Sequence, residues 1–327
     1  PLTRSHAAPN PVSVRRRLLR WYDLNARVLP WRAGKGKPPD PYRVWLSEIM
    51  LQQTTVAAVK DYYLDFVTRW PKVEDLARAG LDEVLHAWQG LGYYTRARNL
   101  HKCARLVAAD FGGRFPDTEQ DLQKLPGIGK YTAAAIAAIA FGRKTMPIDA
   151  NIERVTARLF AVADPLPKAH KKISNFAQGL ASKSCPGDMA QAMMDLGATV
   201  CTAKSADCGA CPLAPDCLGR KSGRVELYPV KPPKKKRPLR HGFVFWAVRD
   251  DGRVLLRKRP EKGLLGGMTE FPSTEWREKI WGLKEVQALA PVEAAWKTLD
   301  GSVRHTFTHF HLELTVLSGQ VQDGNGL

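Results

Sequence analysis

Two acidic residues are the first candidates for chemistry. Glu48 lies in a predicted helix among mostly apolar neighbours, so burial is expected to raise the pKa of its carboxyl group. A carboxyl group that stays protonated near neutral pH can act as a general acid, although a solvated glutamate is the plain alternative. Asp149 comes directly before another predicted helix, where it would equally serve as an N-cap. We interpret Glu48 as a candidate acid and Asp149 as a candidate catalytic carboxylate.

A glycine hairpin precedes Asp149 in the chain. Residues 125–130 have the sequence Leu-Pro-Gly-Ile-Gly-Lys, and a short apolar helix follows. Gly127 and Gly129 leave backbone N–H groups unobstructed at a helix N-terminus, where the helix dipole favours an anion. Lys130 adds a positive charge. A Gly-x-Gly pair alone is usually only a turn, but this frame in a basic chain favours a phosphate cradle, which positions the protein on a nucleic acid without recognising sequence.

Four of the six cysteines lie on one short segment, with the spacing Cys201-x6-Cys208-x2-Cys211-x5-Cys217. Four thiolates on one loop can surround a 4Fe–4S cluster or a single zinc ion. Zinc ribbons usually pair their ligands as two close couples, so this spacing favours an iron–sulfur cluster. A loop with so little core of its own indicates a structural role for the cluster. Cys103 and Cys185 are interpreted as buried or spare thiols, and a reducing compartment is expected.

The composition indicates a polyanionic partner. The 327 residues carry a net charge of +18 with a pI near 9.8, which favours nucleic acid over a merely soluble basic protein. No apolar run approaches the length of a membrane span. We expect a monomer in the cytoplasm, associated with the nucleoid, or in the nucleus of a eukaryote, because the basic run 231–238 also resembles a nuclear import signal.

The elements that must position these residues change in character along the chain. Helices are predicted at 13–28, 42–51, 55–69, 72–79, 81–88, 94–110, 118–124, after the hairpin, and at 150–162, 168–182 and 187–200. The sequence therefore predicts an all-α domain over 1–220, with the cysteine loop at 201–217. A basic, Pro-rich linker follows at 221–240. Strands predicted at 243–248, 254–256 and 311–317 indicate a small α+β domain over 241–327.

The hairpin, the downstream aspartate and the four-cysteine loop together resemble the helix-hairpin-helix DNA glycosylases with an iron–sulfur cluster. Within that superfamily the chain is similar to the MutY-type adenine DNA glycosylases. The matching runs cover nearly the whole of residues 13–220 and are Leu29–Arg32, Trp45–Thr54, Leu91–Tyr94, the hairpin with Tyr131, and Gln191–Cys201.

The resemblance assigns roles to single residues. It implies that Glu48 protonates the leaving adenine and that Asp149 stabilises the positively charged sugar, as in glycoside hydrolysis. It implies that Tyr131 and Asn151 orient this site. The residues implied to bind the flipped adenine or to fill the opened duplex are Trp31, Arg32, Gln191, Asp195, Leu51, Gln53 and Tyr94. In the sister family, the endonuclease III type, a lysine amine stands where this chain has Tyr131, so the resemblance implies a monofunctional enzyme without strand cleavage.

The C-terminal domain resembles a Nudix fold. Residues 266–272 match the start of the Nudix pattern, but 276–279 lack its metal-binding glutamates, so the domain is expected to bind rather than hydrolyse. Phe307, Thr308 and His309 match a loop, usually Phe-Ser-His, that recognises 8-oxoguanine opposite the target adenine. The implied partner is duplex DNA with adenine opposite 8-oxoguanine. Thr308 and Ala150, which stands where the family usually has Gly, depart from the pattern.

Three other functions stay open on sequence alone. One is an endonuclease III-type glycosylase and lyase for oxidised pyrimidines, which Tyr131 disfavours. Another is a DNA-binding protein without catalysis, in which changing Glu48 or Asp149 would cost no activity. The third is a nucleotide pyrophosphatase, which the missing Nudix glutamates disfavour.

Overall fold

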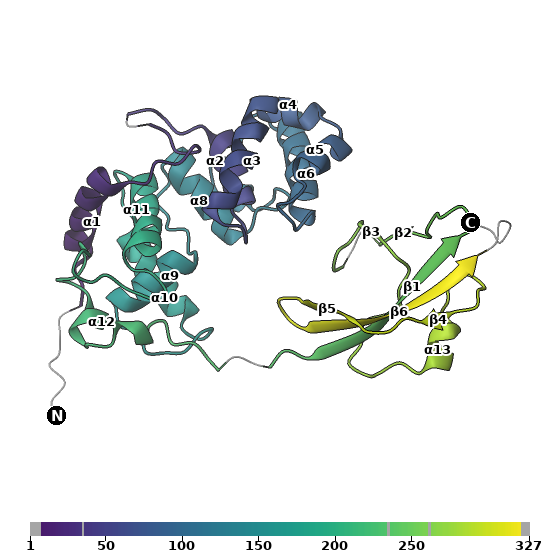
Figure 1. The fold of residues 1–327 in the computed structure, drawn as a ribbon. Helices are drawn as coiled ribbons and strands as arrows, with labels where there is room; N and C mark the ends of the chain where they lie inside the picture. The colour runs from purple at the N-terminus through teal and green to yellow at the C-terminus, as the bar shows by residue number, and fades with distance from the viewer. Residues whose placement is uncertain (1–7, 35, 234–235, 261–262, 322–327) are drawn as a thin grey trace. The chain divides into compact units, whose positions relative to one another are not determined.

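The computed structural model describes residues 8–34, 36–233, 236–260 and 263–321. The chain forms two compact units, residues 1–232 and 233–327. The first is helical and the second contains a sheet (Figure 1), which confirms the expected all-α domain followed by an α+β domain. Within the described part of the chain, no helix has both the length and the apolar character needed to cross a membrane.

The first unit is built from helices close to those predicted. They are α1 (Pro11–Asn25), α2 (Pro41–Met50), α3 (Val56–Arg69), α4 (Val73–Arg78), α5 (Leu81–Ala87), α6 (Thr95–Asp110), α7 (Glu119–Leu122), α8 (Lys130–Phe141), α9 (Ala150–Leu159), α10 (His170–Leu180), α11 (Pro186–Thr199) and α12 (Leu218–Lys221). Local signals start several of them: the Asp40 side chain accepts from the Tyr42 N–H, with Pro41 at the first helical position. The four-residue helix α12 was not predicted.

Two large hydrophobic clusters and a smaller one around Ile173 form the core of this unit, and α8 contributes to both large clusters. One cluster is centred on α2 to α6, and the other on α1 and α9 to α11. Helix α8 packs against α2 and α11 and lies between them in Figure 1. Gly187 of α11 allows the close approach of α8, because a Cβ at Gly187 would lie 3.1 Å from the Ala138 carbonyl oxygen. The seam between the clusters is therefore a defined junction of α2, α8, α9 and α11.

The segment predicted as a linker over 221–240 is partly packed on the first unit. A short 3-10 helix spans Val225–Leu227. The Leu166 N–H then donates to the Val230 carbonyl at 2.9 Å, and Tyr228 packs against the cluster of Val162 and Ile173. Of the basic run, residues 234 and 235 lie outside the described residues.

The second unit is organised around two long parallel strands, β1 (Leu239–Arg249) and β6 (His311–Val321), paired from Leu239↔His311 to Arg249↔Val321. Strands β4 (Lys297–Thr298) and β5 (Val303–Thr306) pair antiparallel with β6. Strands β2 (Arg257–Lys258) and β3 (Thr269–Glu270) form a separate pair, and α13 spans Leu283–Gln287. The core residues of this unit are Phe243, Phe245, Trp281, Val286 and Leu317.

The predicted hairpin around Asp250 is only partly correct. The chain does turn there, and Val248 and Val254 form an antiparallel bridge. The expected strand at 254–256 does not form, because Val254 and Leu256 are exposed and no packing extends the ladder beyond the Leu255–Ala247 hydrogen bond. The regular strand in this region is β2, which begins directly after the expected strand, at Arg257.

Candidate active site

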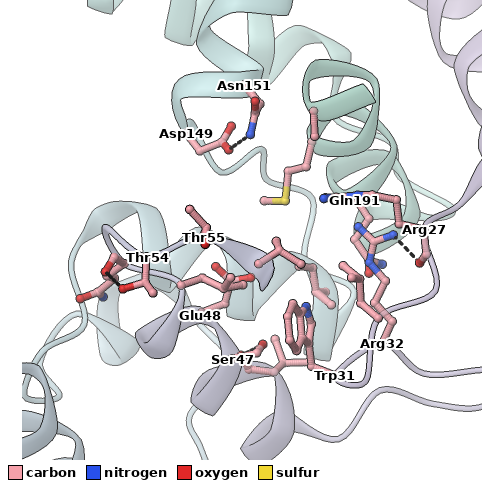
Figure 2. A pocket seen from close by; sticks show the side chains of 18 of the residues that line it. Arg27, Trp31, Arg32, Ser47, Glu48, Thr54, Thr55, Asp149, Asn151 and Gln191 are labelled. Carbon is pink, nitrogen blue, oxygen red and sulfur yellow. Dashed lines mark hydrogen bonds between the residues drawn. The ribbon is translucent and has the colours of Figure 1, made fainter. Parts of the chain in front are cut away.

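A cavity of about 680 Å³ lies at the junction of the helical clusters. Figure 2 shows Glu48 on one side of it, with Asp149 and Asn151 on the opposite side. Arg27, Arg32 and Gln191 lie together at a third side. The structure thus gathers residues from distant parts of the sequence. The predicted site residues that line the cavity are Trp31, Arg32, Glu48, Leu51, Gln53, Tyr131, Asp149, Asn151 and Gln191.

Glu48 is more deeply buried than Asp149, the acid opposite it in this cavity. It lies on α2 and its exposed fraction is 6%. Its Oε2 atom has no hydrogen-bond partner within the described chain. Burial raises the pKa of Glu48 to about 7, against opposing contributions from Tyr131 and Arg32, while the nearby Asp149 raises it further. A buried oxygen without a partner is costly, so this atom is available to a bound ligand.

Asp149 serves as a helix N-cap and also lies at the cavity, so its capping role does not exclude a catalytic one. It is the N-cap of α9, and its Oδ1 accepts from the Ile152 N–H at 2.7 Å. Its Oδ2 accepts from Asn151 Nδ2 at 2.8 Å, and the side chain still lines the cavity. Burial raises the pKa of Asp149, and the hydrogen bonds from Ile152 and Asn151 oppose that rise. The cap therefore fixes the carboxylate in the cavity wall.

Arg154, which the sequence analysis missed, fixes this corner. Its Nη2 donates to Asn151 Oδ1 at 2.8 Å and to the Gly197 carbonyl at 2.7 Å. Its Nε donates to the Cys201 carbonyl at 2.8 Å. Gly197 allows α11 to approach, because a Cβ there would lie 2.6 Å from the Asn151 Cβ. The position of Arg154 three residues after Asn151 was the available signal, since such residues share a helix face.

Asp195 does not line the cavity, contrary to its predicted place in the adenine pocket. Its side chain is fully buried, and its oxygens accept from Arg32 Nη1 and Nη2 at 2.6 and 2.7 Å and from Arg27 Nε at 2.5 Å. These contacts occupy the carboxylate, so Asp195 orients Arg32 and Arg27 rather than meeting a ligand. Arg27 lines the cavity and was missed, because its partner is distant in sequence.

The hairpin at 125–130 presents its glycines outward. Leu125 and Ile128 are buried anchors, whereas Gly127, Gly129 and Lys130 are exposed. Gly127 has φ +78°, a conformation that favours glycine. Lys130, the first residue of α8, is not among the cavity-lining residues, whereas Tyr131 is. The two neighbours thus face different surroundings, as the sequence predicted.

The loop residues expected to enter DNA need one correction. Gln53 is exposed and lines the cavity mouth. Tyr94 was expected to reach into the duplex. Its side chain is instead partly buried and packs against the hydrophobic core. Its neighbour Tyr93 is 55% exposed and has φ 50°. Tyr93 is therefore the ring that this loop presents to solvent.

The four clustered cysteines share one neighbourhood. Burial raises the pKa of Cys211 to about 12, and Cys201, Cys217 and Cys208 each raise it further. Among the described residues, no three His, Cys, Asp or Glu side chains are arranged to hold a single metal ion. The buried Arg158 donates to Cys201 Sγ at 3.3 Å, which suits an anionic thiolate.

In the second unit, residues 307–310 form the turn between β5 and β6. The Phe307 N–H donates to the Phe310 carbonyl at 2.9 Å, and Thr308 and His309 are exposed at its tip. Trp276 stacks on Phe307 with ring centroids 5.7 Å apart. The stacked rings of Trp276 and Phe307 therefore support the exposed tip of the turn.

Glu270, the acid in the Nudix-like run 266–272, is already engaged in ion pairs. Glu270 forms ion pairs with Arg257, at 2.8 Å, and with Arg259. A carboxylate held between two guanidinium groups is poorly placed to bind a metal ion.

Comparisons with known proteins support this architecture. Residues 46–180 match the HhH-GPD superfamily of base excision DNA repair proteins, and residues 243–326 match the NUDIX domain. The solved structure of a thermostable thymine-DNA glycosylase aligns with a TM-score of 0.58 and 29% identity over 65% of this chain and 97% of its own. A non-covalent endonuclease III–DNA complex shares the fold, with a TM-score of 0.53, 22% identity, and coverage of 65% of this chain and 98% of that one. The fold and cavity thus define a helix-hairpin-helix base excision repair protein.

Closer relatives identify the family within this class. The adenine DNA glycosylase of Homo sapiens is 38% identical over 91% of this chain and 65% of its own length. That of Arabidopsis thaliana is 40% identical over 81% of this chain and 48% of its own length. That of Buchnera aphidicola subsp. Acyrthosiphon pisum is 33% identical over 91% of this chain and 83% of its own length. The chain belongs to the adenine DNA glycosylase family, whose members are hydrolases of N-glycosyl bonds.

Proposed function

We propose that this protein excises adenine mispaired with 8-oxoguanine, or with guanine, from duplex DNA. The main support for this proposal is that two acids face each other across one cavity. Glu48 offers a buried, unpartnered oxygen with a pKa of about 7, and Asp149 is held opposite by its helix cap. One acid is suited to give a proton and the other to stabilise positive charge, which is the division of labour in glycoside hydrolysis.

The proposed reaction uses the cavity as follows. The target adenine is flipped out of the duplex, since its glycosidic bond is not accessible in the stack. Glu48 donates its proton to the imidazole ring of adenine, and the electrons of the breaking C1′–N9 bond leave with the base. The Asp149 carboxylate stabilises the resulting sugar cation. Water then adds its hydroxide to C1′ and releases a proton. Asn151, fixed by Arg154, holds Asp149 in place.

We propose that the enzyme is monofunctional. Tyr131 lines the cavity where a lyase would need an amine. The adjacent Lys130 is exposed and lies among the hairpin residues, so it suits a DNA phosphate. The excess positive charge of the chain supports the same partner. The enzyme is proposed to act as a monomer on the chromosome, in the nucleoid or in a eukaryotic nucleus.

Recognition of the opposite base is assigned to Phe307, Thr308 and His309. Their turn is exposed at its tip and supported by Trp276. The Thr308 hydroxyl and the His309 ring can donate hydrogen bonds, and 8-oxoguanine differs from guanine by an added oxygen at C8. We expect the added methyl group of threonine to leave the hydroxyl available.

We propose that Cys201, Cys208, Cys211 and Cys217 hold a 4Fe–4S cluster. When bound, the cluster supplies covalent cross-links to a segment with little apolar core. Arg154 and Arg158 both donate hydrogen bonds to Cys201, so this segment is also tied to α9. The four thiolates would bind the cluster, and the positive charges of Arg154 and Arg158 would offset its negative charge.

A strand-cleavage assay tests the function. A duplex with adenine opposite 8-oxoguanine is incubated with the protein, and the adenine strand is then treated with alkali. Cleavage at the adenine only after alkali is expected, with faster excision opposite 8-oxoguanine than opposite guanine. No cleavage after alkali would contradict the proposal. Efficient cleavage without alkali, or a borohydride-trapped adduct, would instead favour the endonuclease III-type lyase.

A further inference from the structure

The Arg96 side chain connects two surface loops through hydrogen bonds. It lies near the start of α6, and its guanidinium donates to the Ile49 and Met50 carbonyls at the end of α2. It also donates to the Gln52 carbonyl and Thr54 Oγ1 in the first loop, which follows α2. It donates to the Leu91 and Gly92 carbonyls in the second. The Met50 contact measures 2.8 Å, and the Thr54 and Leu91 contacts 3.0 Å each. A single side chain therefore connects segments about 40 residues apart in the sequence.

Each loop has a residue in an unusual backbone conformation at its tip. Gln53 has φ 58° and Tyr93 has φ 50°, in the left-handed region that costs a non-glycine residue about 1 kcal/mol or more. Such conformations persist where the surroundings impose them. The carbonyl of Gln52 and the carbonyl of Gly92, each directly before a tip residue, are both held by Arg96.

The surroundings of Arg96 favour a positioning role. Its guanidinium lies over the Trp88 ring at 5.3 Å and the Tyr93 ring at 5.5 Å. Among the described residues, its buried Nε atom has no hydrogen-bond partner, which is a cost that optimisation for stability alone would remove. Within the described ranges, its hydrogen bonds go to backbone carbonyl oxygens and to the Thr54 hydroxyl, and none goes to a carboxylate. Lysine could not replace it, because one ammonium group cannot serve both loops.

We propose that Arg96 is a positioning residue that holds Gln53 and Tyr93 in the conformation needed to open the duplex. This inference rests on the proposed function. Both tip residues are exposed, and Gln53 lies at the cavity that receives the flipped base. Loss of Arg96 is therefore expected to slow base extrusion, while Glu48 and Asp149 keep their geometry.

The test compares three full-length variants: Arg96→Met, Arg96→Lys and the control His101→Leu. His101 lies on the same helix, is buried, and hydrogen-bonds the Ala79 carbonyl at 2.9 Å, away from both loops. All three are expected to lose some thermal stability. Stopped-flow fluorescence of 2-aminopurine beside the target adenine follows extrusion, and single-turnover excision follows bond cleavage.

Both Arg96 variants are expected to slow extrusion and excision together by on the order of tenfold to a hundredfold on paired duplex. The loss should shrink on a duplex where the adenine faces an abasic site, because that base has no pairing to break. His101→Leu should leave extrusion unchanged. Equal slowing by His101→Leu, or an undiminished loss opposite the abasic site, would overturn the proposal. Failure of the wild-type protein to excise adenine would instead contradict the proposed function. Arg96→Lys keeps the test usable if Arg96→Met does not fold.

Discussion

Glu48 is expected to determine the alkaline limit of the reaction. The protonated form is the proton donor, and burial raises the pKa of Glu48 to about 7. The single-turnover rate should therefore fall about tenfold for each pH unit above that pKa. Asp149 must be ionised, and burial raises its pKa, so the rate should also fall in acid. Rates measured at saturating enzyme from pH 5 to 9 check this profile. An alkaline decline that survives in Glu48→Gln would exclude Glu48 as its source.

Two substitutions at Asp149 can separate the effect of its negative charge from the effect of its helix capping. Asparagine is as good an N-cap as aspartate, so Asp149→Asn should keep the hydrogen bond to the Ile152 N–H. It should lose roughly a hundredfold or more in excision rate, because the negative charge near the sugar is gone. Asp149→Ala should lose the rate and also about 1 kcal/mol of folding stability. Rate measurements and denaturant unfolding distinguish the two, and an active Asp149→Asn would contradict the catalytic role.

At the scale of residues, the sequence predicts well where chemistry and local context coincide. Glu48 was selected by its apolar helix face, and the structure buries it. Asp195 and Tyr94 were placed less well, because their surroundings depend on distant partners. Asp195 meets Arg32 across 163 positions of sequence. The choice between Tyr93 and Tyr94 depends on a left-handed backbone residue, which no side-chain pattern reveals.

The contact between α9 and α11 positions Asp149 and Asn151, which are proposed to act in catalysis. Gly197→Ala would bring a Cβ to 2.6 Å from the Asn151 Cβ and 3.0 Å from its Cα. Because the nearest atoms include backbone, Asn151 must shift and take Asp149 with it. We expect a destabilisation of about 1–3 kcal/mol and a larger proportional loss of excision rate, on the order of a hundredfold.

Gly179 provides the matched control for Gly197. It lies on α10, and a Cβ there meets nothing within 4 Å. Gly179→Ala should be neutral or stabilising by up to about 1 kcal/mol with unchanged excision. Thermal unfolding and single-turnover rates of both variants make the comparison. If both substitutions left the rate unchanged, close approach at Gly197 would not be what positions the acid.

At the scale of elements, the two units differ in how far sequence predicts them. Pro, Gly and capping residues delimit most helices of the first unit, so the predicted bounds lie within a few residues of those observed. The parallel pairing of β1 with β6 joins strands from opposite ends of the second unit. No local signal encodes such a pairing, and short exposed segments such as Val254–Leu256 form strands only where neighbours cover them.

The whole molecule divides its proposed tasks between two separately packed units. The cavity and the cysteine loop belong to residues 1–232, and the described residues of this unit form their own core clusters. The recognition turn at 307–310 belongs to the other unit. The sequence alone predicts this division, because the hydrophobic periodicity changes from helical to strand-like after the basic run.

A chain ending at residue 232 tests the division. Because the first unit has its own core, we expect it to fold and to keep the segment at 225–230 that packs on it. It should still excise adenine opposite guanine at a rate within a few-fold of the full chain, since Glu48, Asp149 and their supports are retained. Its preference for 8-oxoguanine should fall by on the order of tenfold or more, as expected when hydrogen bonds to one base are lost. Parallel single-turnover assays on both duplexes give the ratio. A truncated chain with the full preference would place recognition of 8-oxoguanine in the helical unit and refute the role of Phe307, Thr308 and His309.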